Sequence, residues 1–244
     1  MNLILVEASE VTSVSTITLD DYRARHMLDV LRVVEGQHVR VGMLDGPVGD
    51  GVVLDVVADT VTLGCTWRAP PPRPRVDLLL ALPRPKVLRR LWAQFAALGV
   101  GQIILTNAER VERNYFDTHV LDESDYRPLL LEGLQQARDT HLPRVSVHRQ
   151  FRVLVEDTLD SLTPDTRRIV AEPGEAQGIR AALAAPAPDE RVLLAVGPEG
   201  GWNEFELRML HAHRFAPVSL GPRTLRSDTA CLALLTLVHD ALRA

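Results

Sequence analysis

The chain has few cysteines, no long apolar run and no surplus of positive charge. Its two cysteines, Cys65 and Cys231, are far apart, so a disulfide framework is not expected and a reducing cytosol is favoured. No run reaches the roughly 18 apolar residues that a membrane span requires, and the longest, residues 230–238, contains Thr236. The N-terminal residues lack the basic and then apolar segments of a signal peptide. We therefore expect a cytoplasmic protein that does not contact the membrane.

Positive charge is scarce in the first part of the chain in particular. The formal net charge is −5, from 27 basic and 32 acidic residues. Residues 1–72 hold five arginines and ten acids, so the remainder is balanced at 22 of each. Lys86 is the single lysine. Neither part has the overall positive field typical of nucleic-acid binding, and any contact with RNA must use local patches.

The proline-rich segment APPPRP, residues 69–74, is the clearest domain boundary. Four prolines in six residues cannot extend a helix or a central strand, and they favour a stiff linker. Before it lie short alternating strands and one helix, which we expect to start at an Asp20 N-cap, to run to about Val34 and to be closed by Gly36. This pattern favours a small β-barrel with one helix.

After the linker, near-continuous apolar strands alternate with helices. This order indicates a parallel sheet covered on both faces. We expect strands at residues 76–82, 101–106, 168–171, 192–196 and 218–220, and helices at residues 86–98, 128–138 (with Pro128 in the first turn), 175–184, 203–213 and 227–242.

Residues 192–206, VLLAVGPEGGWNEFE, form the first informative motif. Its glycines let the backbone turn sharply and let a ligand approach it closely. Asn203 and Glu206 have the spacing of a capping box. Glu199 would repel a phosphate, and neither GxGxxG nor GxxxxGK[ST] occurs, so a cationic or amine-bearing ligand is favoured. Taken alone, the motif also fits a plain turn before a capped helix.

A second motif, LGPRTLRSDTACLALL at residues 220–235, repeats the arrangement of strand, Gly-Pro turn and helix. We expect Ser227 to cap the last helix, with Asp228 in its first turn. Arg226 just before this helix is placed to meet an anion, although a solvated pair with Asp228 fits equally well. Two such turns close together indicate one pocket built mostly from backbone, as in an enzyme that binds a small cofactor.

Together, GPEGG and LGPRTLRSDTA closely resemble the SPOUT class of methyltransferases and, within it, the RsmE-type 16S rRNA uridine-N3 methyltransferases. The resemblance extends over the whole chain. Residues 25–36 are similar to that family's N-terminal signature, and residues 82–86 and 98–100 to the start of its catalytic domain. The chain departs from the family at Ala97, where Glu is usual, and in residues 135–139.

The resemblance implies an α/β protein of two domains. Residues 1–72 would form a PUA-like β-barrel that helps to hold RNA, and residues 73–244 a SPOUT α/β domain with a trefoil knot. S-adenosyl-L-methionine would bind in the knot of a homodimer, and the apolar segment 230–238 independently favours burial against a partner. The implied cofactor-binding residues are Glu172, Gly197, Glu199, Gly200, Leu220, Gly221, Leu225 and Ala230.

The implied reaction is methylation of N3 of a uridine in 16S rRNA within the small ribosomal subunit. N3 is a poor nucleophile until its proton leaves, so the resulting anion must be stabilised, and Arg226 is our candidate for that role. Glu199 is a catalytic candidate that either accepts the proton or orients the cofactor, and the sequence leaves both open. The candidates for RNA contacts are Arg25, Arg32, Lys86 and Arg223.

Two other functions fit the same motifs. One is a non-catalytic, dimeric RNA-binding platform, and the other is a SPOUT methyltransferase that acts on another RNA, such as tRNA. No metal site is expected, because His211 and His213 are two residues apart on a predicted helix and point to different sides, with no cysteine cluster nearby.

Overall fold

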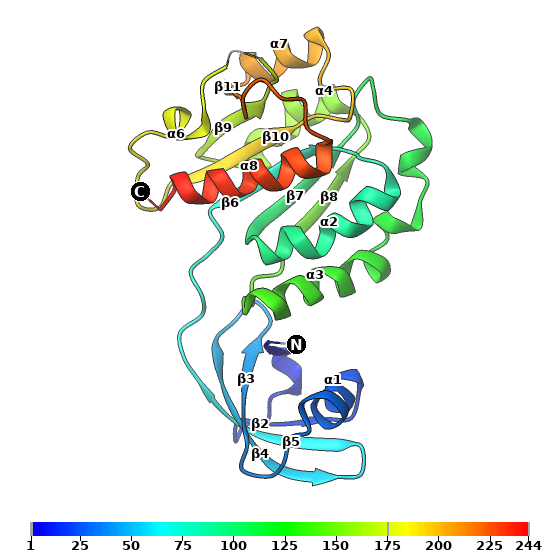
Figure 1. Cartoon of the computed structure of the whole chain (residues 1–244), viewed down its shortest axis with the longest axis vertical. Coiled ribbons are helices and arrows are strands. Elements are labelled where there is room, and N and C mark those ends of the chain that lie inside the picture. The colour runs from blue at the N-terminus through cyan, green and yellow to red at the C-terminus, as the bar shows by residue number, and fades with distance from the viewer. Residues whose placement is uncertain (1, 175, 244) are drawn as a thin grey trace. The chain divides into compact units, whose positions relative to one another are not determined.

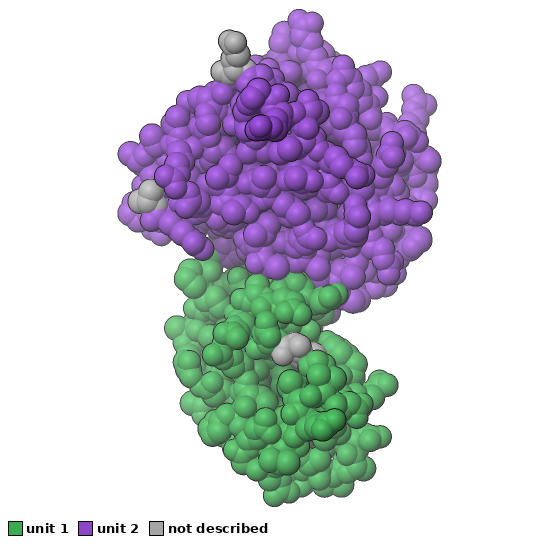
Figure 2. Space-filling view, viewed as in Figure 1, with its two compact units in different colours: residues 1–73, 130–142 green, residues 74–129, 143–244 purple. Residues whose placement is uncertain are grey.

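The computed structural model of the chain describes residues 2–174 and 176–243. These residues divide into two compact units, coloured separately in Figure 2. The first unit holds residues 1–73 and 130–142, and the second holds residues 74–129 and 143–244. The boundary between the two units at residues 73 and 74 therefore lies inside the proline-rich segment. The sequence gives no sign that residues 130–142 group with the first unit.

The first unit is built on a curled five-stranded sheet with the strand order β1-β3-β4-β5-β2. Strand β1 pairs with β3 in parallel, and the remaining pairs are antiparallel. The strands are β1 (Ile4–Val6), β2 (Thr16–Leu19), β3 (His38–Met43), β4 (Val48–Val57) and β5 (Thr60–Trp67). Ile17, Val41 and Leu63 are fully buried in the core between the sheet and its helix.

The helix of the first unit is shorter than expected. Helix α1 (Tyr22–His26) continues as one π-helical turn (Met27–Leu31), and Arg32 then takes a left-handed conformation with φ 51°, which ends the helix before Val34. The N-cap is Asp21 and not Asp20, because the Oδ1 atom of Asp21 accepts a hydrogen bond of 2.8 Å from the Arg23 amide. The expected cap position is therefore wrong by one residue.

Arg23 joins this helix to β1. Its side chain is 10% exposed and donates hydrogen bonds to the Leu5 carbonyl at 2.8 Å, to Glu10 and to Asp21. A buried guanidinium is tolerated because two carboxylates and a carbonyl satisfy its donors. The cluster fixes the start of the chain against the first turn of α1.

The second unit is a six-stranded sheet in which all pairs are parallel, with the order β11-β9-β10-β6-β7-β8. This confirms the expected parallel sheet. The strands are β6 (Val76–Ala81), β7 (Val100–Thr106), β8 (Arg144–His148), β9 (Thr166–Ala171), β10 (Arg191–Val196) and β11 (Phe215–Val218). Every residue of β6 is buried, as a central parallel strand requires.

Helices α2 and α8 lie on one face of this sheet and contact each other (Figure 1). In α2, Leu88, Leu91, Trp92 and Phe95 recur at helical spacing and are buried. The helices are α2 (Pro85–Ala97), α3 (Glu123–Ala137), α4 (Phe151–Val153), α5 (Leu159–Leu162), α6 (Ile179–Ala182), α7 (Glu204–Ala212) and α8 (Ser227–Ala241).

Two helix starts differ from the expectation. Helix α3 begins at Glu123, so Pro128 lies inside the helix and not in its first turn. The ring of Pro128 removes only one backbone donor, and the helix continues because Leu130 and Leu134 bury its apolar face. The other helix, α6, begins at Ile179; the expected start at Glu175 lies outside the described residues. Within residues 2–174 and 176–243, no helix has the length and apolar character needed to cross a bilayer.

Candidate active site

The carboxyl ends of three neighbouring strands, β9, β10 and β11, meet the start of α8 around a cavity of about 200 Å³, which we call the strand-end cavity. Open parallel sheets bind ligands at this edge because the loops there diverge. The cavity is lined by residues 171–173, 196–201, 218–221 and 223–225, and by Ser227, Ala230 and Leu234.

All eight residues expected to bind the cofactor lie in this lining. The loop after β9 contributes Glu172, the loop after β10 contributes Gly197, Glu199 and Gly200, the loop after β11 contributes Leu220, Gly221 and Leu225, and α8 contributes Ala230. The structure thus brings together residues that are up to 58 positions apart in the chain.

Two glycines of the first motif lie in close contact with neighbouring side chains. A Cβ atom on Gly197 would lie 3.1 Å from the Trp202 ring, and one on Gly200 would lie 2.8 Å from Cδ of Arg110. The Arg110 guanidinium donates a hydrogen bond to the Gly200 carbonyl and also reaches the Gly201 carbonyl at 3.5 Å. Arg110 therefore supports the outer side of the loop while its inner side faces the cavity.

The same loop is anchored at its end by the start of α7. Oδ1 of Asn203 accepts a hydrogen bond from the Glu206 amide at 2.8 Å, and Oε2 of Glu206 accepts one from the Asn203 amide at 2.8 Å. This is the expected capping box, and it is confirmed. Glu206 is 3% exposed, and its second oxygen accepts a hydrogen bond from the Glu109 amide at 2.7 Å.

The second motif is held by its own backbone. Ser219 Oγ accepts a hydrogen bond from the Gly221 amide at 3.1 Å, and Gly221 has a φ of 98°, which favours glycine. The amide of Glu172 donates to the Val218 carbonyl at 2.9 Å, which ties the first loop of the cavity to β11. The Glu172 carboxylate lies 3.3 Å from Nε2 of His211.

A second hollow, of about 370 Å³, adjoins the strand-end cavity, and we call it the arginine hollow. Glu199 and Leu225 line both spaces. The catalytic candidates Glu199 and Arg226 therefore face one space, together with Arg84, whose Nε lies 4.0 Å from Oε1 of Glu199. The remaining lining residues are Val87, Thr224, Ser227 and Asp228.

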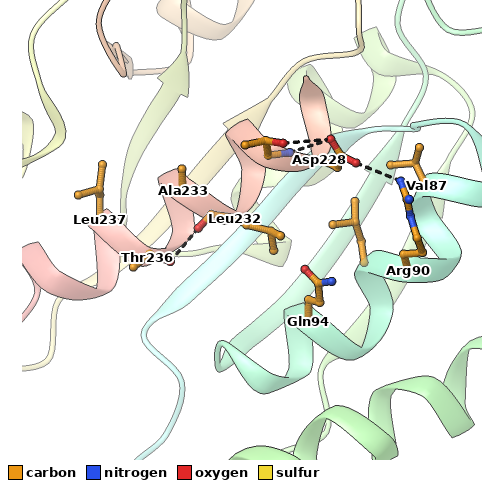
Figure 3. Close-up of a pocket in the computed structure, with 10 residues that line it drawn as sticks. Val87, Arg90, Gln94, Asp228, Leu232, Ala233, Thr236 and Leu237 are labelled. Carbon is orange, nitrogen blue, oxygen red and sulfur yellow. Dashed lines mark hydrogen bonds and ion pairs between the residues drawn. The ribbon is translucent and has the colours of Figure 1, made fainter. Parts of the chain in front are cut away.

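Arg226 itself is the N-cap residue of α8, so the expected cap at Ser227 is wrong by one position. Ser227 is the first helical residue. Asp228 pairs with Arg90, in contrast to the solvated pair with Arg226 that the sequence also allowed. Its Oδ2 accepts a hydrogen bond from Arg90 on α2 at 3.1 Å, as Figure 3 shows, and this leaves Arg226 directed at the arginine hollow.

A third hollow, the basic hollow, is lined by Arg84, Pro85, Lys86, Val87, Arg90, Glu112, Tyr115 and Arg226 and measures about 910 Å³. Four cations and one carboxylate line this hollow, so it is a local positive patch. A chain without an overall positive field would need such a patch to contact RNA. Tyr115 donates a hydrogen bond to Glu112 at 2.9 Å, and partial burial together with this bond raises the pKa of Tyr115.

The four residues expected to contact RNA are divided between the two units. Lys86 lines the basic hollow, and Arg223 lines the strand-end cavity. Arg25 and Arg32 belong to the first unit, where both are exposed.

Helices α2 and α8 also border a groove of about 750 Å³ (Figure 3). Arg90 and Asp228 close one end of it, and Leu91, Leu232 and Leu237 give it an apolar floor. Leu237 is 39% exposed, which is high for a leucine in a helix with such an apolar sequence. We call this space the α2–α8 groove.

Sequence reasoning missed Arg84, Arg110 and Tyr115. None of them belongs to either motif, and each reaches the site from a separate loop or helix end. The only signal was the position of Arg84 and Arg110 just after buried strands, where functional side chains of parallel sheets gather. Within the described ranges, no group of three or more His, Cys, Asp or Glu residues could hold a metal ion.

Residues 70–239 match the family model of the RNA methyltransferase domain, and the chain belongs to this family. This confirms the methyltransferase resemblance of the two motifs. The chain is 28% identical over 254 residues to ribosomal RNA small subunit methyltransferase E of Treponema pallidum, covering 98% of this chain and 90% of that protein. It is 23% identical over 244 residues to ribosomal RNA small subunit methyltransferase E 1 of Borreliella burgdorferi, covering 96% and 95%.

The fold is shared along the whole chain with solved structures. Ribosomal RNA small subunit methyltransferase E from Neisseria gonorrhoeae, bound to S-adenosyl methionine, has a TM-score of 0.78 at 20% identity and covers 98% of this chain and 97% of that one. A methyltransferase from Legionella pneumophila in complex with the same cofactor has a TM-score of 0.75 at 20% identity, with the same coverage.

Proposed function

We propose that the protein uses S-adenosyl-L-methionine to methylate N3 of a uridine in the 16S rRNA of the small ribosomal subunit. One observation carries the proposal: the residues of both motifs line a single cavity, in a chain that belongs to the RNA methyltransferase family. The relatives that cover almost the whole chain are named as small-subunit rRNA methyltransferases, which supports the substrate.

The residues of the strand-end cavity fit the cofactor. Leu220, Leu225 and Leu234 give an apolar wall suited to an adenine ring, and the loop glycines leave backbone groups accessible to its polar edge. The carboxylates of Glu172 and Glu199 suit the positive charges of the methionine end and would repel a phosphate. When bound, the cofactor supplies an electrophilic methyl group on a sulfonium.

We assign Arg226 and Glu199 to the methyl-transfer step. Arg226 lines the arginine hollow beside the strand-end cavity, where its guanidinium stabilises the charge that develops on the ring as the N3 proton leaves. Glu199 faces both spaces, so its carboxylate is placed either to take that proton or to fix the methionine end of the cofactor. Holding N3 in line with the methyl group provides the rest of the acceleration.

The base must leave any stack to reach a cavity at the strand ends. Lys86 in the basic hollow and Arg223 beside the strand-end cavity contact the RNA backbone from the second unit. In the first unit, the curled sheet is a PUA-like barrel, and its exposed residues Arg25 and Arg32 add further phosphate contacts.

The second unit is a SPOUT domain whose C-terminal segment passes through a trefoil knot, and the enzyme works as a homodimer. The apolar floor of the α2–α8 groove supports the dimer, because the exposed Leu237 and the partly buried Leu232 of α8 lose contact with water when a second copy covers them. The groove shares Val87, Arg90 and Asp228 with the two hollows, which supports a site at the subunit interface.

The proposal is tested by mass spectrometry of nucleosides from small-subunit rRNA. A strain that lacks the gene is expected to lose one N3-methyluridine, and the wild-type gene to restore it. If the rRNA were unchanged and the modification were lost from tRNA instead, 16S rRNA would be excluded as the substrate. Calorimetric titration with S-adenosylmethionine tests the enzyme separately, since a non-catalytic RNA-binding platform is expected to bind none.

A further inference from the structure

Arg84 lies between the two functional spaces of the second unit. It lines the arginine hollow with Glu199 and Arg226, and it lines the basic hollow with Lys86 and Tyr115. Its side chain is 67% exposed, and its Nε lies 4.0 Å from Oε1 of Glu199, whose side chain is 37% exposed. An exposed pair at this distance is weak, so Arg84 can exchange Glu199 for another anion at little cost.

Among the described residues, Arg84 forms an ion pair with one carboxylate, and it also interacts with the Tyr115 hydroxyl. Asp228 accepts a hydrogen bond from Arg90, and Glu112 accepts one from Tyr115. Among the residues that the structure describes, Glu199 is the carboxylate that Arg84 reaches within 4.0 Å. On the side of the basic hollow, Arg84 faces three further cations and the carboxylate of Glu112, so the net positive charge attracts an RNA phosphate there.

We propose that Arg84 couples the two substrates by alternating between Glu199 and an RNA phosphate; this inference rests on the proposed function. A cationic cofactor in the strand-end cavity claims the Glu199 carboxylate and repels the guanidinium. Arg84 then turns to the phosphate in the basic hollow. Because linkage is reciprocal, the phosphate in turn leaves Glu199 to the cofactor, and each ligand tightens the other.

The coupling depends on charge and therefore changes as the reaction proceeds. Methyl transfer would remove the positive charge of the sulfonium and leave that of the α-ammonium, so the product cofactor would compete less strongly for Glu199. Arg84 returns to Glu199, and one phosphate contact is lost at the moment when the methylated RNA must leave. Arg84 is thus a positioning residue for RNA, controlled by the charge of the cofactor.

The test measures RNA binding and not turnover. Small ribosomal subunits from a strain lacking the gene are titrated with the full-length protein in the presence of a saturating cofactor analogue. One analogue is sinefungin, which carries an amine in place of the methylsulfonium. The other is S-adenosylhomocysteine, whose sulfur at that position is neutral. For the wild type we expect the Kd to be about fivefold lower with sinefungin. For Arg84→Gln we expect the two values to agree.

The salt dependence provides a second readout. With sinefungin, the slope of log Kd against log salt is expected to fall by about one in Arg84→Gln relative to the wild type, since one phosphate contact is lost. With S-adenosylhomocysteine the slopes are expected to agree. Arg89→Gln is the matched control, because Arg89 is exposed on α2, the helix that Arg84 precedes, and is not among the residues that line either hollow in the described part of the chain.

The outcomes separate this inference from the proposed function. Binding that is equally tight with both ligands in the wild type overturns the coupling and leaves the proposed function standing. A sinefungin preference that survives in Arg84→Gln, or is lost equally in Arg89→Gln, overturns the role of Arg84. Absence of binding with either ligand overturns the proposed substrate and the coupling together.

Discussion

The amide of Glu109 donates a hydrogen bond of 2.7 Å to the carboxylate of Glu206, 97 residues further along the chain. The bond joins the loop after β7 to the first turn of α7, and the next residue in that loop, Arg110, holds the Gly200 carbonyl. One buried carboxylate thus fixes the two segments that shape the first motif.

Glu206→Gln is expected to lower the free energy of unfolding by about 2 kcal/mol, because the new amide nitrogen faces a backbone N–H and leaves a buried donor unsatisfied. Urea unfolding measures this as a lower midpoint at unchanged m-value. Glu204→Gln on the same helix is the control, since Glu204 is exposed and forms an exposed pair with Arg208. Equal losses in both variants would contradict the bridging role of Glu206.

Gly221→Ala is expected to weaken S-adenosylmethionine binding. Gly221 has a φ of 98° and Gly36 has a φ of 80°, and an added Cβ atom meets nothing within 4 Å at either position. Both alanine variants should therefore lose about 1 kcal/mol of stability from backbone strain alone. Calorimetry should show weaker binding in Gly221→Ala and unchanged binding in Gly36→Ala, which is in the first unit. An unchanged affinity in Gly221→Ala would remove this loop from the cofactor site.

Arg226→Ala is expected to bind S-adenosylmethionine as the wild type does and to lose methyl transfer by on the order of a hundredfold. Arg226 lines the arginine hollow but not the strand-end cavity, so its loss affects the developing charge on the uracil and not the cofactor. Calorimetry and single-turnover methylation separate the two effects. Arg208→Ala, an exposed arginine on α7, serves as the control. Methylation at the wild-type rate in Arg226→Ala would exclude this arginine from the mechanism.

The acid stability of the first unit is expected to depend on Glu10. Hydrogen bonds from the Arg23 guanidinium lower the pKa of Glu10 below its ordinary value of 4.5. A lowered folded-state pKa means that this stabilisation is fully present above pH 4.5 and is lost as the pH falls through the folded value. Glu10→Gln should therefore be less stable than the wild type at pH 7, and the difference should shrink below pH 4.5.

Urea unfolding of both proteins between pH 3 and pH 7 checks this dependence. Glu35→Gln, an exposed carboxylate of the same unit, provides the comparison. A constant difference between Glu10→Gln and the wild type across this range would show that Glu10 acts through packing and not through its charge.

Local sequence patterns predicted the parallel sheet because its central strands are mostly apolar and its helices carry a clear apolar face. The lining of the strand-end cavity was also predictable, since both motifs follow strands that end at the same edge of one sheet. The capping box at Asn203 was readable because its two side chains are three residues apart.

Other features depend on tertiary contacts that local patterns do not encode. Strand β8 lies at the sheet edge and is partly exposed, so RVSVH lacks a strong apolar signal. Asp21 and Arg226 are the N-cap residues of α1 and α8. Each has a neighbour, Asp20 or Ser227, whose side chain could cap a helix equally well or better, so the sequence alone did not place these caps. The approach of Arg84 to Glu199 is set by the pairing of β6 with β10, which joins segments more than a hundred residues apart.

The strand-end cavity has a consequence for the order in which the protein matures. Its walls come from residues 171–234, and the last of them, Ala230 and Leu234, lie on α8. During synthesis, residues 1–73 can form their curled sheet long before α8 leaves the ribosome, because domains fold as their residues emerge. A nascent chain that ends at Gly201 contains the whole GPEGG loop and still has no closed pocket. The growing polypeptide is therefore expected to bind no cofactor until α8 has docked.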